Sequence, residues 1–130
     1  MHPFSPENLG TKIMYYHTPN SQTVFTYLSF RFVKRLIEVI RSAAEAGKSL
    51  DYVALRHLQP RDREQVLREL NLSPEQSVSL EEVGYHGTND SLVSLDLALR
   101  EGRISDGARV VLASAGIGFS YAAAVIRWGR

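Results

Sequence analysis

The sequence lacks several groups that define common classes of protein. It contains no cysteine, which excludes disulfide bonds, thiolate metal ligands and a cysteine nucleophile within this chain. No apolar run approaches the roughly 20 residues that a membrane-spanning helix needs. Residues 1–4 also lack the basic segment and apolar stretch that begin a secretory signal. We therefore expect a cytoplasmic protein that does not enter a membrane.

Charge and metal-binding patterns are equally sparse. Fifteen Lys and Arg residues face 14 Asp and Glu residues, which gives a net charge of +1 and no case for nucleic-acid binding. The four histidines show no ligand spacing with nearby carboxylates, so we expect no metal site. What remains is 130 residues, 44% of them hydrophobic, which suffices for one folded domain with a core.

The first part of the chain predicts a loose lead-in and then a long helix. Residues 1–19 are rich in Pro and polar groups, with a short strand expected at 12–16, and the domain proper is expected at 20–130. Apolar residues recur at helical spacing over 22–46, and Gly47 can end that helix. Because its apolar arc covers nearly the whole circumference, this helix is typical of a larger interior or an interface.

Strands and helices alternate after residue 50. Strands are predicted at 52–55, 77–83, 110–113 and 121–126, and helices at 60–70 and 92–101, with a capping box at 73–76. Pro60 suits the first position of its helix, and Gly102 ends the later one. The pattern predicts an α/β layered fold that closes with an antiparallel strand pair.

Six segments of the chain occur in an order that resembles a known family. They are 51–57, 70–74, 86–89, 98–104, 116–121 and 125–128. In this order they resemble the C-terminal half of the 3-oxoacyl-[acyl-carrier-protein] synthase III enzymes, which are thiolase-superfamily condensing enzymes. The resemblance covers roughly residues 20–128. It implies an α/β thiolase-like half-fold, with a mixed β-sheet flanked by helices.

The resemblance also implies a reaction and a set of site residues. In this family a cysteine of the N-terminal half carries an acyl group, which a decarboxylating malonyl unit attacks. A histidine and an asparagine face that cysteine and donate hydrogen bonds to the developing enolate oxygen. The matching residues are His57, with a neutral ring donating from Nε2, and Asn89. Gly116, Ile117 and Gly118 match the loop whose backbone holds the thioester oxygen.

Each assignment has a structural alternative. His57 can be a polar residue at a strand end, and the Leu58-Gln59-Pro60 that follows departs from the family's His-Gln-Ala-Asn. Asn89 can simply cap the next helix, or His86 can occupy its place in the site. The glycine segment at 116–118 can be a tight turn between two strands.

Basic residues on the helix after His57 complete the expected site. In the family, such residues meet an acidic acyl carrier protein or the phosphates of coenzyme A, and the candidates are Arg61, Arg63 and Arg68. Acidic residues are interspersed among them, so an ordinary solvated face is the alternative. No cofactor is expected, because the coenzyme A or carrier-protein thioester is a substrate.

The absence of cysteine means that catalysis requires another chain or region. We expect a partner, either a chain carrying the cysteine-bearing N-terminal half or further copies of this chain. The helix at 22–46 is the expected contact surface. The chain is then an acyltransferase only when it is completed by that cysteine. The alternatives are a non-catalytic scaffolding subunit and an acyl transferase that works without decarboxylation.

Overall fold

The computed structural model describes residues 21–45, 48–116 and 120–129, with side chains from residue 31 onward. The predicted lead-in at 1–19, the strand at 12–16, Gly47, Ile117 and Gly118 lie outside the described residues. Within them, no helix is long and apolar enough to cross a bilayer. The same part of the chain contains no cluster of three His, Asp or Glu side chains that could bind a metal.

A mixed three-stranded sheet forms the centre of the fold. Its order is β1 (Tyr52–Leu55), β2 (Arg109–Gly116) and β3 (Ser120–Arg127). β1 runs parallel to β2, and β3 pairs antiparallel with β2. The predicted buried strand at 52–55 and the closing antiparallel pair are therefore confirmed.

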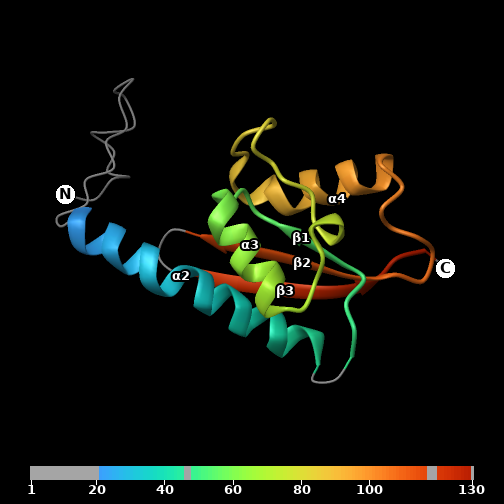
Figure 1. The fold of residues 1–130 in the computed structure, drawn as a ribbon, viewed down its shortest axis with the longest axis horizontal. Helices are drawn as coiled ribbons and strands as arrows, with labels where there is room; N and C mark the ends of the chain where they lie inside the picture. The colour runs from blue at the N-terminus through green and yellow to red at the C-terminus, as the bar shows by residue number, and fades with distance from the viewer. Residues whose placement is uncertain (1–20, 46–47, 117–119, 130) are drawn as a thin grey trace, which may run out of the picture.

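Helices lie on both sides of this sheet (Figure 1). They are α2 (Ser21–Ala44) and α3 (Pro60–Glu69) on one side and α4 (Asp90–Arg100) on the other, with short 3-10 helices η1 (Pro74–Gln76) and η2 (Gly87–Asn89) in the connections. Pro60 takes the first position of α3, as predicted. Gln76 completes the predicted capping box by accepting the Ser73 backbone N–H at 2.9 Å. Gly102 follows α4 with a φ of 68°, a conformation that glycine adopts without strain.

Alternate strand residues supply two separate hydrophobic cores. Val53 and Leu55 of β1 pack on the side of α2 and α3, whereas Tyr52 and Ala54 pack on the side of α4. This two-residue period is what a strand buried on both faces produces.

The expectation that the long helix is apolar nearly all round is wrong for its described side chains. One face of α2 is buried against the sheet, and the opposite face is charged. The buried set is Val33, Leu36, Ile37, Ile40 and Ala44, and the exposed set is Arg31, Lys34, Arg35, Glu38 and Arg41. Over 31–44 the helix is therefore amphipathic, and its apolar face is used within the chain.

The predicted strand at 77–83 is also wrong, because side chains bind its backbone groups in place of a neighbouring strand. The Val78 N–H donates to the Tyr52 hydroxyl at 2.9 Å, and the Arg63 guanidinium donates to the Ser77 carbonyl. A turn then follows, in which the Gly84 N–H donates to the Leu80 carbonyl at 2.8 Å. Val78 and Leu80 of this segment still enter the core on the α4 side, whereas Val83 is exposed.

Candidate functional site

The candidate site lies where the parallel strands β1 and β2 end. Leu55 pairs in register with Ala113, so the residues that follow β1 lie beside the last residues of β2. His57 comes two residues after β1, and Gly116 ends β2. η2, which contains Asn89, contacts β2 at the same edge. Three segments that the sequence nominated are thus brought to one edge, the carboxyl edge, where α/β sheets commonly bind ligands.

His57 is half-buried, and its ring and backbone are both fixed. Its backbone N–H donates to Asp90 Oδ2 at 2.9 Å, and its Nδ1 lies 3.2 Å from the Leu80 carbonyl oxygen. Because a carbonyl can only accept, Nδ1 carries the proton in this contact. A neutral ring then leaves Nε2 without a proton. This differs from the expected arrangement, in which a neutral His57 donates from Nε2.

Asn89 and His86 lie on the loop that faces this strand end. Asn89 occupies the N-cap position of α4, but its side chain makes no capping hydrogen bond and is exposed. His86 is exposed as well, and its Nδ1 lies 3.2 Å from the Gly84 carbonyl oxygen. Its backbone N–H donates to Asp90 Oδ1 at 2.6 Å. The alternative that the Asn89 side chain caps the helix is therefore not realised, and the side chain remains available at this edge.

Asp90 is a residue of the site that the sequence did not nominate. It is fully buried, and its two carboxylate oxygens accept the backbone N–H groups of His57 and His86. Asp90 is also the first residue of α4, where the helix dipole favours a negative charge. An acidic residue at a helix start is usually exposed, so no sequence pattern indicated that this carboxylate joins two loops.

Arg56 is a second residue that sequence reasoning missed. Its guanidinium carbon lies 5.1 Å from the centre of the Phe32 ring and 5.3 Å from the centre of the Tyr85 ring. Its Nη1 donates to the Ala115 carbonyl at 2.6 Å. Each cation–π contact contributes about 0.5–2 kcal/mol. Arg56 therefore connects α2, the end of β1, the 84–89 loop and the end of β2 beside His57.

The three candidate docking arginines differ in their surroundings. Arg61 and Arg68 are exposed on α3. Arg63 is instead turned into the chain, where its Nη2 donates to the Pro74 carbonyl at 2.7 Å and to the Ser77 carbonyl. Burial lowers the pKa of the Arg63 guanidinium. Arg63 therefore holds the segment after η1, and only the other two face outward.

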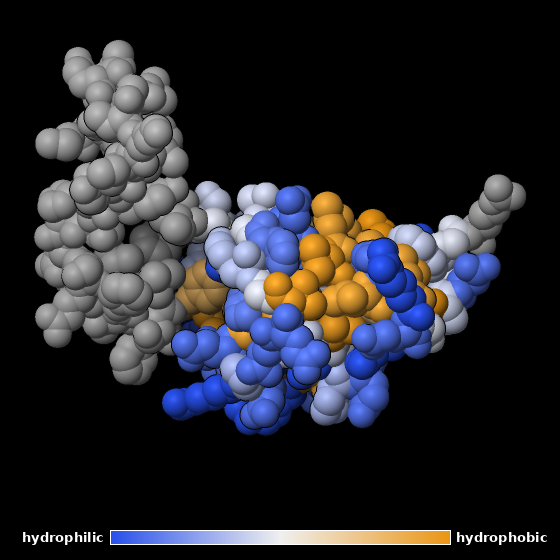
Figure 2. All heavy atoms as spheres, turned by 90° about the horizontal axis from the view of Figure 1, so that it is seen from above, coloured by the Kyte–Doolittle hydropathy of each residue, from blue (hydrophilic) through white to orange (hydrophobic). Residues whose placement is uncertain are grey.

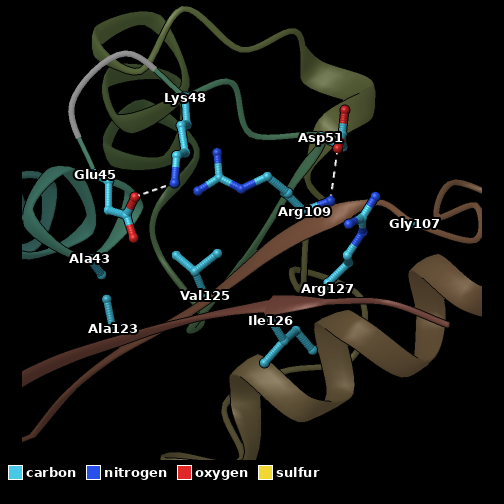
Figure 3. A pocket seen from close by; sticks show the side chains of 10 residues that line it. All are labelled: Ala43, Glu45, Lys48, Asp51, Gly107, Arg109, Ala123, Val125, Ile126 and Arg127. Atoms are coloured by element: carbon cyan, nitrogen blue, oxygen red, sulfur yellow. Dashed lines mark hydrogen bonds and ion pairs between the residues drawn. The ribbon is translucent and has the colours of Figure 1, made fainter. Parts of the chain in front are cut away.

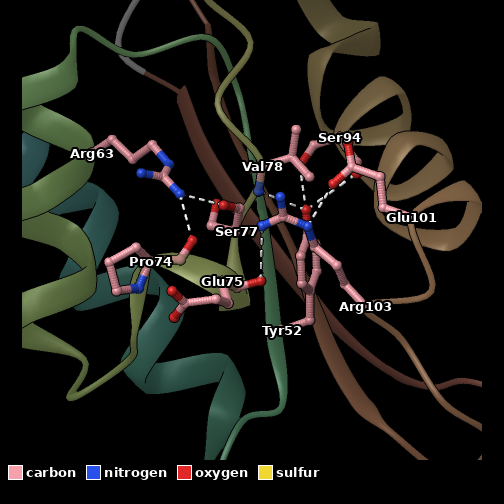
Figure 4. A network of polar contacts seen from close by, with 9 residues as sticks. All are labelled: Tyr52, Arg63, Pro74, Glu75, Ser77, Val78, Ser94, Glu101 and Arg103. Carbon is pink, nitrogen blue, oxygen red and sulfur yellow. Dashed lines mark hydrogen bonds and ion pairs between the residues drawn. The ribbon is translucent and has the colours of Figure 1, made fainter.

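Figure 4 shows the polar network that Arg63 shares with Tyr52 and Arg103. The Tyr52 hydroxyl lies 3.0 Å from Ser94 Oγ and accepts the Val78 N–H. Arg103 Nη1 donates to the Glu75 carbonyl at 3.2 Å. Burial raises the pKa of the Tyr52 phenol, because the phenolate would lose its hydration. This network fastens the connection between α3 and α4 onto β1.

A hollow of about 750 Å³ lies at the opposite edge of the sheet, where β1 and β2 begin (Figure 3). Its most prominent side chain, Arg109, donates to the carbonyls of Ala44 at 2.9 Å and Ser49 at 2.8 Å, and its backbone N–H donates to Asp51. These bonds cap the end of α2 and fix the start of β2. Neither His57 nor Asn89 lines the hollow, so it is separate from the candidate site.

The fold and the order of the site segments define a class of protein. The α/β arrangement, with a mixed sheet flanked by helices, is a thiolase-like half-fold, and structures of condensing enzymes superimpose on it. The family model described as "3-Oxoacyl-[acyl-carrier-protein (ACP)] synthase III C terminal" matches residues 40–128. The chain therefore belongs to the family of 3-oxoacyl-[acyl-carrier-protein] synthase III C-terminal domains.

Full-length relatives support this assignment. A β-ketoacyl-[acyl-carrier-protein] synthase III of Symbiobacterium thermophilum is 30% identical over 129 residues, which cover 98% of this chain and 39% of that protein. A crystal structure of the corresponding enzyme from Thermus thermophilus has a TM-score of 0.72 at 26% identity and covers 98% of this chain and 39% of its own. The Pseudomonas aeruginosa structure has a TM-score of 0.74 at 22% identity over 92% of this chain. The chain thus spans about two fifths of the length of these relatives.

Proposed function

We propose that this chain is the C-terminal part of an acyl-thioester condensing enzyme and supplies His57 and Asn89 to a cysteine nucleophile outside the present sequence. The observation that carries the proposal is the meeting of His57, the loop that contains Asn89, and Gly116 at one edge of the sheet. The relatives are named for acyl-carrier-protein synthase activity. The substrate is then a thioester of coenzyme A or of a carrier protein, in fatty acid or polyketide-like metabolism.

The proposed roles follow from charge that develops on oxygen. The amide of Asn89 donates a hydrogen bond to the enolate oxygen that forms as the malonyl unit loses carbon dioxide. His57 donates from Nε2 when both ring nitrogens are protonated, since Nδ1 is already engaged with the Leu80 carbonyl. Backbone N–H groups of the segment that begins at Gly116 hold the oxygen of the cysteine-bound thioester.

We propose that the cysteine-bearing partner covers the side of the molecule where α4 lies. The exposed large apolar residues of the described chain are Val83, Tyr85 and Leu92, and all three belong to α4 or to the loop before it. Figure 2 shows an apolar area on this side. An apolar area of this kind is typical of an interface. The partner is a chain or region with the N-terminal half-fold, or a second copy of this chain.

Arg61 and Arg68 are the residues of α3 that we propose for docking a phosphate group or an acidic carrier protein. Both are exposed and lie seven residues, or about two helical turns, apart. Arg63 is not part of this surface, because it donates to backbone carbonyls within the chain. Replacement of Arg61 and Arg68 by Glu is expected to raise KM for the acyl donor, whereas Arg63→Lys mainly lowers stability.

A scaffolding role is the second candidate, favoured by the exposed apolar area on the α4 side together with the absence of cysteine. Here the half-fold would stabilise a partner without contributing to catalysis. This reading needs the α4 surface and tolerates replacement of His57 and Asn89.

The test combines native mass spectrometry of the chain from its source with kinetics of the reconstituted complex. We expect a stoichiometric complex with a cysteine-bearing chain or region. Within it, His57→Ala should lower condensation by about 10²–10³-fold, the usual effect of removing an oxyanion donor. Lys34→Ala is the control, since it changes an exposed side chain on α2, away from the site. Unchanged turnover in both variants would leave the scaffolding role.

A further inference from the structure

A buried carboxylate beside the candidate site has no role in the reaction described above. Asp90 is 0% exposed. Burying an ionised carboxylate costs several kcal/mol unless hydrogen bonds replace its hydration. The side-chain bonds recorded for it come from two backbone N–H groups, at 2.9 Å from His57 and 2.6 Å from His86. The carboxylate therefore ties together two segments that are 29 residues apart (86 minus 57), both at the site.

The position of Asp90 in α4 makes this tie rigid. It is the first residue of the helix, and its own N–H donates to the Gly87 carbonyl. Its backbone is thus set by the helix and η2, while its side chain sets the backbone of His57. A displacement of either loop would leave a buried carboxylate oxygen without its donor, which is costly.

The ring of His57 is fixed by a second partner, the backbone carbonyl of Leu80. With the backbone held by Asp90, Nδ1 lies 3.2 Å from the Leu80 carbonyl oxygen. This contact is a hydrogen bond only when Nδ1 carries the proton. In the neutral ring Nε2 then has a free lone pair, which accepts a proton and cannot donate one.

We infer that neutral His57 acts as a proton acceptor at Nε2. We infer further that Asp90 is a positioning residue, which holds the His57 backbone so that Nδ1 meets the Leu80 carbonyl, the contact that sets this tautomer. The inference adds to the proposed function a further class of acyl acceptor, one whose attacking atom carries a proton. Hydroxyl and amine groups belong to this class, whereas a decarboxylating malonyl unit does not need a proton acceptor.

Acyl transfer to a hydroxyl or amine needs no further reagent. The step rests on the proposed function, which supplies the cysteine-bound thioester. The hydroxyl or amine attacks the thioester carbon as its proton passes to Nε2 of His57. The new carbon–oxygen or carbon–nitrogen bond forms and the carbon–sulfur bond breaks. The leaving thiolate then takes the proton from Nε2, which restores both the thiol and the neutral ring.

The tautomer is testable on the full chain, without a partner or a substrate. Nitrogen-15 NMR of the imidazole groups, at a pH where the rings are neutral, reports which nitrogen carries the proton. The His57 signals are assigned from their loss in His57→Gln. We expect a protonated Nδ1 in the wild-type chain. A protonated Nε2 overturns the inference, whatever the outcome of the condensation assay.

The positioning role of Asp90 is tested by Asp90→Asn, with Asp96→Asn as the matched control. Asp96 is an exposed residue of the same helix that pairs with Arg100 at 2.8 Å. In Asp90→Asn we expect the His57 nitrogens to move toward the averaged shifts of the chain in denaturant, while Asp96→Asn keeps the wild-type pattern. If Asp90→Asn fails to fold, Asp90→Ser retains one acceptor for the same measurement. A purely structural role predicts a lower melting temperature with the His57 tautomer unchanged, and that result overturns the positioning role.

Discussion

The two faces of the sheet differ in how completely they are covered. On one face, α2 contacts both β2 and β3, and α3 packs beside it, so the core extends across the whole sheet. On the other face, α4 contacts β1 and β2. Ala122 and Ala124 of β3 are exposed there, and Leu92 of α4 is 54% exposed. We call the first face finished, because helices cover all three strands on that side. We call the second face unfinished, because α4 leaves part of β3 exposed.

This difference bears on where we propose that a partner binds. The sequence pointed to the long helix as the surface that meets a partner, yet over 31–44 its apolar face is consumed by the chain's own sheet. The unfinished side is that of α4. The chain spans about two fifths of the length of its relatives, and we propose that a further half-fold or a second copy of the chain covers this side.

The largest expected effect is a loss of stability from a substitution on the finished face. Leu36 is fully buried on α2, and Leu36→Ala should lower the free energy of unfolding by about 2–5 kcal/mol, as large-to-small core changes do. Leu92→Ala, on the unfinished face, should cost less than about 1 kcal/mol, because much of its surface is already in water. Urea denaturation of both variants checks the contrast, and equal losses would contradict it.

An intermediate effect is expected from the polar anchor under α4. Tyr52→Phe leaves the buried Val78 N–H without its acceptor, so we expect a loss of about 1–3 kcal/mol. The raised pKa of Tyr52 adds a pH dependence. The unfolded chain loses the phenol proton near pH 10 while the folded chain keeps it, so wild-type stability falls as pH rises through the folded pKa. Thermal melts from pH 8 to 11 should show less of this decline in the Phe variant.

The smallest effect on stability is expected from a substitution on the unfinished face that should mainly affect assembly. Leu92→Asp should change the free energy of unfolding of the isolated chain by no more than about 0.5 kcal/mol, as exposed substitutions usually do. It should nevertheless weaken assembly with the cysteine-bearing partner at least tenfold, which is about 1.4 kcal/mol. Lys34→Asp, on the exposed face of α2, is the control and should leave assembly unchanged. The reverse ranking by native mass spectrometry would return the interface to α2.

The parts of the fold that local patterns determine could be predicted. The apolar run at 52–55, the proline at the start of α3 and the glycine after α4 each act over a few residues. The segment at 77–83 could not be predicted, since its backbone groups are taken by Tyr52 and Arg63, 26 and 14 residues away. Apolar content alone does not reveal which partner satisfies a buried N–H.

The candidate site likewise contains residues that the sequence could nominate and residues that it could not. His57 was nominated by its place after a strand, and Gly116 by the glycine segment that ends β2. Asp90 and Arg56 were not, because their importance lies in burial and in partners from other elements. A carboxylate at a helix start and an arginine after a strand are ordinary surface patterns until the tertiary structure surrounds them. The roles of His57, Asn89 and the glycine segment stay predictions until the complex is assayed.

The contacts around His57 also bear on how the molecule folds. The bond from His57 to Asp90 spans 33 residues, the contact of its ring with Leu80 spans 23, and the bond from Arg56 to Ala115 spans 59. Contacts between such distant residues require the closure of long loops, which slows folding. The site therefore depends on segments that are far apart in the sequence, and a chain in which these loops have not closed lacks it.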